Sequence, residues 1–103
     1  MFIHGDGPPD VIRDIKDWGQ YVSWGELLAS TGIAAVTFNH RSSRGGTRMH
    51  DVASDIDAAL DYVASNAEEW NLDASRLGLW SCSMGVPFAL RAAFDRSSSP
   101  ACR

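Results

Sequence analysis

Apolar positions in this chain form short unbroken stretches separated by longer segments with helical spacing. The stretches at residues 1–4, 33–38 and 76–80 predict three strands. The middle stretch is continuously apolar and rich in β-branched residues, without polar alternation. Such a run is typical of a strand buried on both faces of a parallel sheet. Polar, glycine-rich sequence after the first two stretches predicts loops over residues 8–17 and 39–47.

Three helices are predicted between and after the strands. Ser23, with Glu26 three residues later, has the form of a capping box, and Gly32 is the expected stop of that short helix. The last helix is expected over residues 86–94, where Pro87 is tolerated in the first turn.

The central helix is predicted from Asp51, which can serve as its N-cap. Its apolar positions recur at helical spacing: Val52, Ile56, Ala59, Leu60, Val63 and Ala67. The acidic positions Asp55, Asp57 and Asp61 fall largely between them, which predicts a solvent-facing side.

Strands that alternate with helices predict the α/β class, here a three-layer α/β/α arrangement on a parallel sheet of about three strands and three helices. One domain is expected over residues 1–94, followed by a polar, disordered tail at 95–103. A sheet this narrow has two open edges, which favours association with a partner.

Composition narrows the function classes. The chain has 103 residues, a formal net charge of -4 and 45% hydrophobic residues, so no charge argument supports binding to nucleic acid or to an anionic membrane. No apolar run has the length of a membrane helix, and no signal peptide is visible, so a cytoplasmic location is the default expectation. The two cysteines and three histidines lack metal-ligand spacing, so neither a metal nor a cofactor is expected.

The strongest chemical signal is Ser81-Cys82-Ser83-Met84-Gly85, placed between a predicted strand and a predicted helix. A serine nucleophile stands exposed on a sharp strand-to-helix turn, which demands small residues two positions to either side. Ser81 and Gly85 occupy those positions around Ser83. A thiol nucleophile would belong at position 83, so Cys82 is expected to be a structural thiol.

A second signal is the loop His4-Gly5-Asp6-Gly7 after the first strand. Glycines allow backbone N–H groups to approach a ligand closely. One donor from this loop, together with the N–H of Met84, would form a two-point oxyanion hole.

These two motifs, with Asn39-His40-Arg41 after the second strand, resemble the α/β-hydrolase family, in particular its esterase, dienelactone-hydrolase and prolyl-oligopeptidase-like members. The resemblance covers residues 1–94. It implies that Ser83 is the nucleophile, that Met84 N–H is one oxyanion donor and that Asp6 or Gly7 N–H is the other, with His4 and Gly5 supporting the loop. It also implies a small-molecule ester substrate or, less favoured, a peptide.

The chain departs from this family after Ser83. Family members place the triad acid and then the histidine downstream of the serine. Here Asp95 is the sole acid after Ser83, and no histidine follows it. His40 and His50 are the local alternatives, but a loop residue and a solvated helix start are the expected roles. The base is therefore expected from outside this central segment of a larger domain.

Two alternatives to a hydrolase follow from the sequence. The chain can be a non-catalytic truncated fragment or a pseudoenzyme module, because a serine without a base is a poor nucleophile. A nucleotide-binding domain is disfavoured, because Gly5-Asp6-Gly7 lacks the further glycine of the dinucleotide motif and no P-loop lysine is present.

Overall fold

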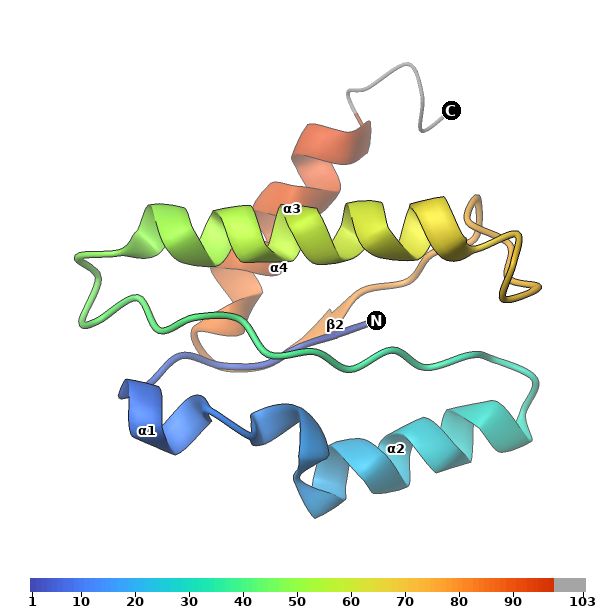
Figure 1. Ribbon diagram of the computed structural model, residues 1–103, viewed down its shortest axis with the longest axis horizontal. Coiled ribbons are helices and arrows are strands. Elements are labelled where there is room, and N and C mark those ends of the chain that lie inside the picture. The colour runs from blue at the N-terminus through green and yellow to red at the C-terminus, as the bar shows by residue number, and fades with distance from the viewer. Residues whose placement is uncertain (98–103) are drawn as a thin grey trace.

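The computed structural model describes residues 1–97 of the chain, and residues 98–103 lie outside the description. Helices make up most of the regular structure (Figure 1). In chain order the elements are β1 (Phe2–Ile3), α1 (Pro9–Ile12), the 3-10 helix η1 (Ile15–Asp17), α2 (Gly19–Ser30), α3 (Met49–Asn66), β2 (Trp80–Ser81) and α4 (Gly85–Ser97).

The sheet consists of β1 and β2, which pair in parallel with Phe2 opposite Trp80 and Ile3 opposite Ser81. The apolar run at residues 33–38 joins them only through an isolated bridge between Phe2 and Thr37. The prediction of a three-layer α/β/α fold on a sheet of about three strands is therefore wrong for the described residues.

The difference has a local cause at both ends of the expected pairing. β1 is two residues long, because the chain turns away at the glycine- and proline-rich sequence after His4, so little ladder is available to a neighbour. At the start of the predicted middle strand, Ile33 is 55% exposed. An apolar run reports a tendency to be buried, whereas a strand also needs continuous backbone partners.

Two apolar clusters lie on the two sides of β1. Ile3 packs with Val52, Ile56 and Leu60 of α3 and with Phe88, Ala89 and Ala92 of α4. Phe2 packs with Ile12, Ile15 and Tyr21 from the α1–α2 segment. Consecutive strand residues point to opposite faces, so this two-residue strand contributes to both clusters. Figure 1 shows α3 on one side of the extended segments and α1 and α2 on the other, with α4 crossing behind α3.

The prediction of the central helix is confirmed. Five of its expected apolar positions are buried, namely Val52, Ile56, Leu60, Val63 and Ala67. The helix begins slightly earlier, at Met49, and Asp51 lies in its first turn without capping it.

The acidic side of α3 is more than a solvated face. Asp57 pairs with Arg91 of α4 at 2.8 Å, and Asp61 pairs with Arg96 at 2.5 Å. These ion pairs join α3 to α4 where the two helices cross, beside the apolar contacts.

The N-terminal third differs from its prediction in helix boundaries. Residues 8–17, expected as loop, contain α1 and η1, and Pro9 takes the first helical position, where its missing N–H costs nothing. α2 begins at Gly19, so Ser23 lies inside the helix and is not its cap. Its end agrees with the prediction, because Gly32 follows in the left-handed region with φ 87°.

At the C-terminal end, α4 continues past the predicted last helix to Ser97. Residues 95–97 of the expected tail are thus helical, and the rest of that tail lies outside the described residues. Among residues 1–97, no helix combines the length and the apolar character needed to cross a membrane.

Candidate functional site

Ser83 lies on the turn that joins β2 to α4. Its backbone adopts a left-handed conformation with φ 50°, which is uncommon for a residue other than glycine. The turn is closed by Gly85 N–H donating to Cys82 O at 2.9 Å and Val86 N–H donating to Ser83 O at 3.2 Å. Ser83 is exposed. The sequence therefore places an accessible hydroxyl on a strained strand-to-helix turn, a type of position that clusters at functional sites.

Gly85 allows α4 to begin directly against β1. A Cβ atom at this position would lie 2.6 Å from His4 O and 2.8 Å from Ile3 O. Both contacts are with backbone, which cannot move aside as a flexible side chain can. The close approach of α4 to β1 therefore explains why a small residue is needed two positions after Ser83.

Gly5 brings the other predicted motif to Ser83. A Cβ atom at Gly5 would lie 3.4 Å from Ser83 Cβ and 3.8 Å from Ser83 Oγ. The His4–Gly7 loop and the Ser83 turn, far apart in the sequence, are thus neighbours in space. A Cβ at Gly5 would make ordinary van der Waals contacts with Ser83, so the loop lies directly against the Ser83 side chain.

His4 is buried behind this loop and serves to order it. Its Nε2 atom accepts the backbone N–H of His40 at 3.2 Å, which places the ring proton on Nδ1, 2.6 Å from Gly5 O. The two imidazole rings stack with centroids 3.8 Å apart and planes 14° from parallel. Burial lowers the pKa of His4 to about 4, so its ring is neutral near pH 7.

None of the histidines hydrogen-bonds Ser83, and all of them lie within the described residues. The ring nitrogens of His40 contact His4 O at 3.0 Å and Arg41 O at 2.8 Å. His50 is exposed in the first turn of α3. Residues 1–97 therefore provide no histidine base that is hydrogen-bonded to Ser83.

Asp6 and Gly7 are tied to the loop that follows residues 33–38. The Asp6 carboxylate accepts the Ser43 N–H at 3.0 Å and the Ser43 hydroxyl, while Gly7 O accepts the Ser42 hydroxyl at 2.5 Å. Burial raises the pKa of Asp6, but these hydrogen bonds from Ser43 and one from Gly7 N–H outweigh it, and the net pKa is below its usual value.

Sequence reasoning missed the buried hydroxyls of Ser42 and Ser43. They lie in the polar stretch predicted as a loop, separated from the apolar run at residues 33–38 by Asn39-His40-Arg41. Two adjacent hydroxyl residues within that loop are the one available signal. Their partners, Asp6 and Gly7, are more than thirty positions away in the sequence.

Cys82 points away from the loop, toward α2. Its Sγ atom lies 3.7 Å from Tyr21 Oη. Burial and this neighbouring thiol raise the pKa of Tyr21 to about 12. Among residues 1–97, no group of three or more His, Cys, Asp or Glu side chains has an arrangement that could hold a metal ion.

Comparison with known proteins places the chain at the level of a family. No match was found among curated proteins or among solved structures. The family model BD-FAE, which describes an α/β-hydrolase-like esterase family, matches residues 1–99. The α/β-hydrolase resemblance carried by the Ser83 and His4–Gly7 motifs is thereby confirmed at this coarse level, and the chain belongs to the BD-FAE family.

Proposed function

We propose that this chain carries the nucleophile and the oxyanion hole of a serine esterase. The observation that carries the proposal is the approach of Gly5 to Ser83, which sets a strained, exposed hydroxyl beside a glycine loop. In the proposed reaction the Ser83 hydroxyl oxygen attacks the ester carbonyl carbon and its proton passes to a base. The alcohol then leaves with a proton, and water hydrolyses the acyl-enzyme.

The oxyanion donors in this proposal are the N–H groups of Met84 and Asp6. Met84 follows Ser83 at the start of α4, where helix N–H groups and the helix dipole favour negative charge. Gly7 is the less favoured second donor, because its N–H already interacts with the Asp6 carboxylate. Ser43 holds the Asp6 carboxylate in place. The His4 ring contacts Gly5 O and so orients the peptide group that carries the Asp6 N–H.

The base and its acid are proposed to come from outside this 103-residue sequence. The ring nitrogens of His4 and His40 are hydrogen-bonded to each other's backbone and to the carbonyl oxygens of the residues that follow them. His50 is exposed on α3. The proposed substrates are carboxylic esters. The finer similarity to dienelactone hydrolases and prolyl oligopeptidases makes peptides a second, less favoured class.

The same observation about histidine favours one alternative function. A chain of this sequence without an added base is a non-catalytic module, since an unassisted serine hydroxyl is a weak nucleophile near pH 7. The two functions differ in whether Ser83 reacts once a base is supplied.

Labelling with a fluorophosphonate, with imidazole as a soluble base, separates them. We expect one covalent adduct, located on the Ser83 peptide by mass spectrometry, in the natural chain and in Ser81→Ala. Ser83→Ala should give none. Ser81 is a matched control, because it is a serine of the same turn segment that the proposal leaves out of the chemistry.

Labelling that persists in Ser83→Ala would show that the nucleophile is assigned wrongly. A natural chain that stays unlabelled with imidazole present would favour the non-catalytic module. Ester hydrolysis by the chain alone, lost in Ser83→Ala, would instead show that a base lies within it.

A further inference from the structure

A cleft beside residues 39–48 concentrates positive charge. It has a volume of about 410 Å³ and lies between the α1 segment, the loop after residue 38 and the start of α3. Four of the chain's nine basic residues line it, although the net charge of the chain is -4. These residues are Arg13, Arg41, Arg44 and Arg48. Two acids, Asp51 and Asp55, share the lining, so the cleft keeps an excess of positive charge.

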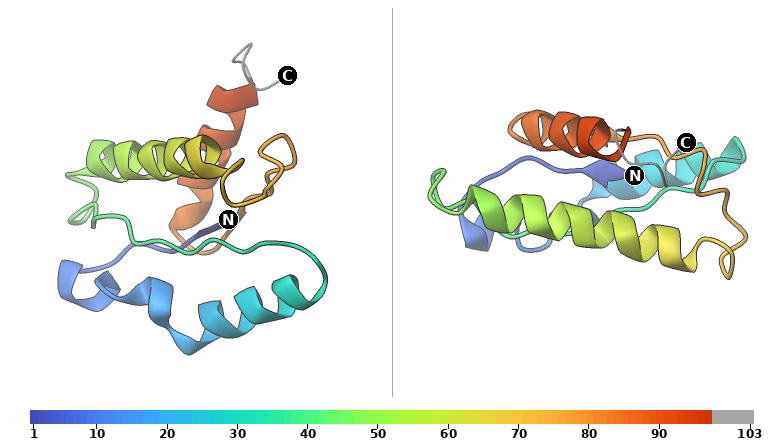
Figure 2. Two further views of the ribbon diagram at one scale, coloured as in Figure 1. Left: turned by 45° about the vertical axis from the view of Figure 1, so that its right-hand side comes forward. Right: turned by 90° about the horizontal axis from the view of Figure 1, so that it is seen from above.

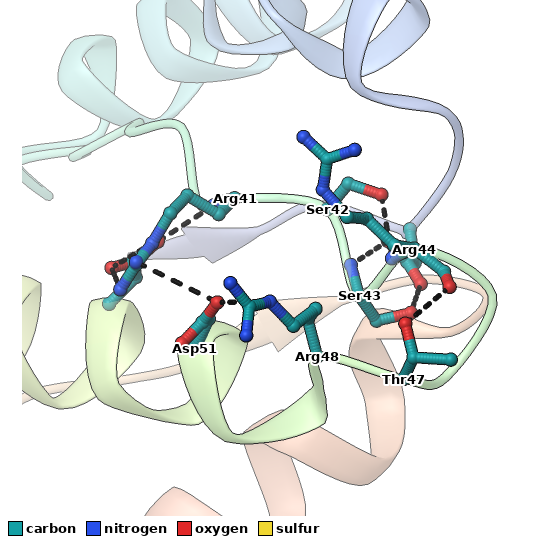
Figure 3. A network of polar contacts seen from close by, with 9 residues as sticks. Arg41, Ser42, Ser43, Arg44, Thr47, Arg48 and Asp51 are labelled. Carbon is teal, nitrogen blue, oxygen red and sulfur yellow. Dashed lines mark hydrogen bonds and ion pairs between the residues drawn. The ribbon is translucent and has the colours of Figure 1, made fainter.

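The two acids are used to hold two of the arginines. Arg41 forms a two-pronged contact with Asp55, with Nη2 2.9 Å from Oδ1 and Nε 3.0 Å from Oδ2. Arg48 Nε lies 3.3 Å from Asp51. Figure 3 shows Arg41 and Arg48 converging on Asp51 from two sides. These pairs fix one wall of the cleft.

The other two arginines keep unused donors. Arg44 has no carboxylate partner among residues 1–97, and no dashed line reaches its guanidinium in Figure 3. Within residues 1–97 the Arg13 guanidinium pairs with its sequence neighbour Asp14 alone, at 3.4 Å, and the two side chains are 75% and 70% exposed. Exposed pairs of this kind contribute little, so Arg13 is available to a ligand.

The backbone that carries Arg44 is held in place. Arg44 has φ 50°, a left-handed conformation that is strained for an arginine. Its N–H donates to the buried Ser42 hydroxyl at 3.0 Å, and that hydroxyl donates to Gly7 O. On the opposite side, Asn39 Nδ2 donates to Arg13 O at 2.6 Å. The guanidinium groups of Arg44 and Arg13 therefore project from anchored backbone.

We propose that this cleft binds a small anion through a carboxylate or phosphate group, with Arg44 as the principal donor and Arg13 as the second. A guanidinium offers two parallel N–H donors that match either group. Pro9 and Ile12 give the cleft an apolar wall for the carbon part of the ligand. Ser83 does not line this cleft, so a test of anion binding is independent of the esterase proposal.

Calorimetric titration of the purified chain with inorganic phosphate and with succinate, at constant ionic strength set by sodium chloride, tests the site. We expect saturable binding in at least one arm, and the arm that saturates identifies the chemistry of the ligand. Arg44→Gln should weaken the binding about tenfold, as expected for the loss of a charged hydrogen-bond donor. Arg44→Lys, which keeps the charge without the planar fork, should fall in between.

Arg76→Gln is the matched control, because Arg76 is exposed and lies in the turn before β2, outside the cleft. It should bind like the natural chain. Arg13→Gln provides a second cleft variant at a highly exposed position, and melting curves check that every variant is folded. Absence of saturable binding in both arms, or equal weakening by Arg44→Gln and Arg76→Gln, would overturn the proposal.

Discussion

Gly85 is the residue at which the Ser83 turn meets β1. Its lack of a side chain lets α4 start against the carbonyls of Ile3 and His4, and Gly5 of the neighbouring loop lies against Ser83. At the scale of single residues, the position of the Ser83 turn therefore depends on the missing side chain of Gly85 as much as on Ser83 itself.

Gly85→Ala tests this close packing. Alanine is the better helix former by about 1 kcal/mol, but its Cβ would overlap two backbone oxygens. We expect the overlap to dominate and the free energy of unfolding to fall by about 1–3 kcal/mol, as for overpacked cores. Urea denaturation followed by circular dichroism measures the change.

Gly25→Ala is the control at a second helical glycine. There the new Cβ would lie 3.6 Å from the Ala35 Cβ, an ordinary contact. The helix-propensity gain then has no opposing clash, so α2 should be stabilised by up to about 1 kcal/mol. Equal effects at the two glycines would contradict the packing argument.

These glycines show what a sequence reveals at this scale. Ser81-Cys82-Ser83-Met84-Gly85 could be recognised because the turn demands small residues at fixed offsets from Ser83. The stack of His4 on His40 could not be recognised. It joins residues 36 positions apart, and no local pattern marks either ring as buried.

At the scale of elements, the loop over residues 39–48 links the site to α3. It receives the His4 ring, the Asp6 carboxylate and the Gly7 carbonyl, and Arg41 ties it to Asp55 by N–H and guanidinium contacts. Arg48 N–H donates to Ser43 O at 2.7 Å, and the Arg48 guanidinium contacts Asp51 in the first turn of α3 (Figure 3), so the loop is joined to the start of that helix. The position of the proposed oxyanion loop thus depends on a segment without regular structure.

The hydrogen bond from His40 N–H to His4 Nε2 makes the stability of this loop sensitive to acid, because protonation of Nε2 removes the acceptor. The pKa of His4 is about 4 in the folded chain, below the ordinary histidine value of 6.5, so the unfolded chain binds more protons between these two pH values. The stabilisation is complete above pH 6.5 and is lost as the pH falls toward 4. Between pH 7.5 and pH 5 we expect the free energy of unfolding to fall by at most about 2 kcal/mol from this residue.

Denaturant titrations of the natural chain and of His4→Gln at both pH values isolate the effect. The variant should be less stable at pH 7.5 but should lose less stability on acidification. His50→Gln is the control, because His50 is exposed on α3 and should leave the pH dependence unchanged. An identical pH dependence in His4→Gln would contradict a buried neutral His4.

Elements also differ in how well the sequence predicts them. α3 could be predicted because one face repeats Val52, Ile56 and Leu60 over several turns, which is a signal internal to the helix. The strand expected over residues 33–38 depends on neighbours elsewhere in the chain, and the two-residue β1 offers it only the Phe2–Thr37 bridge. The local pattern of apolar residues in one strand cannot predict the length of the strand with which it would pair.

At the scale of the whole molecule, two apolar clusters are held apart by β1. In the left view of Figure 2, turned by 45° from Figure 1, α4 crosses behind α3, and α2 lies on the other side of the extended segments. The cluster of α3, α4 and Ile3 contains the most deeply buried aliphatic residues of the described chain. It is therefore expected to supply most of the stability.

Leu60→Ala tests that expectation. Leu60 is 1% exposed in the centre of this cluster, and its truncation leaves a cavity. We expect a loss of about 2–5 kcal/mol, enough to unfold a domain of this size at moderate temperature. Leu27→Ala makes the same chemical change on α2 at a residue that is 64% exposed, and it should change stability by less than about 0.5 kcal/mol. Similar losses in both variants would mean that the α3–α4 cluster is not the core.

The pairing of β1 with β2 has a consequence for the order in which the molecule assembles. It joins segments that lie far apart in the chain: Phe2 is opposite Trp80, and the Met1 ammonium group donates to Gly78 O at 2.8 Å across a separation of 77 positions. Closing so long a loop has a high entropic cost, which contacts within α2 and α3 do not share. The helices can therefore form early, while Gly5 meets Ser83 only after β1 has paired with β2. During synthesis the proposed oxyanion loop does not yet lie beside Ser83, so the candidate site is assembled only when this pairing is complete.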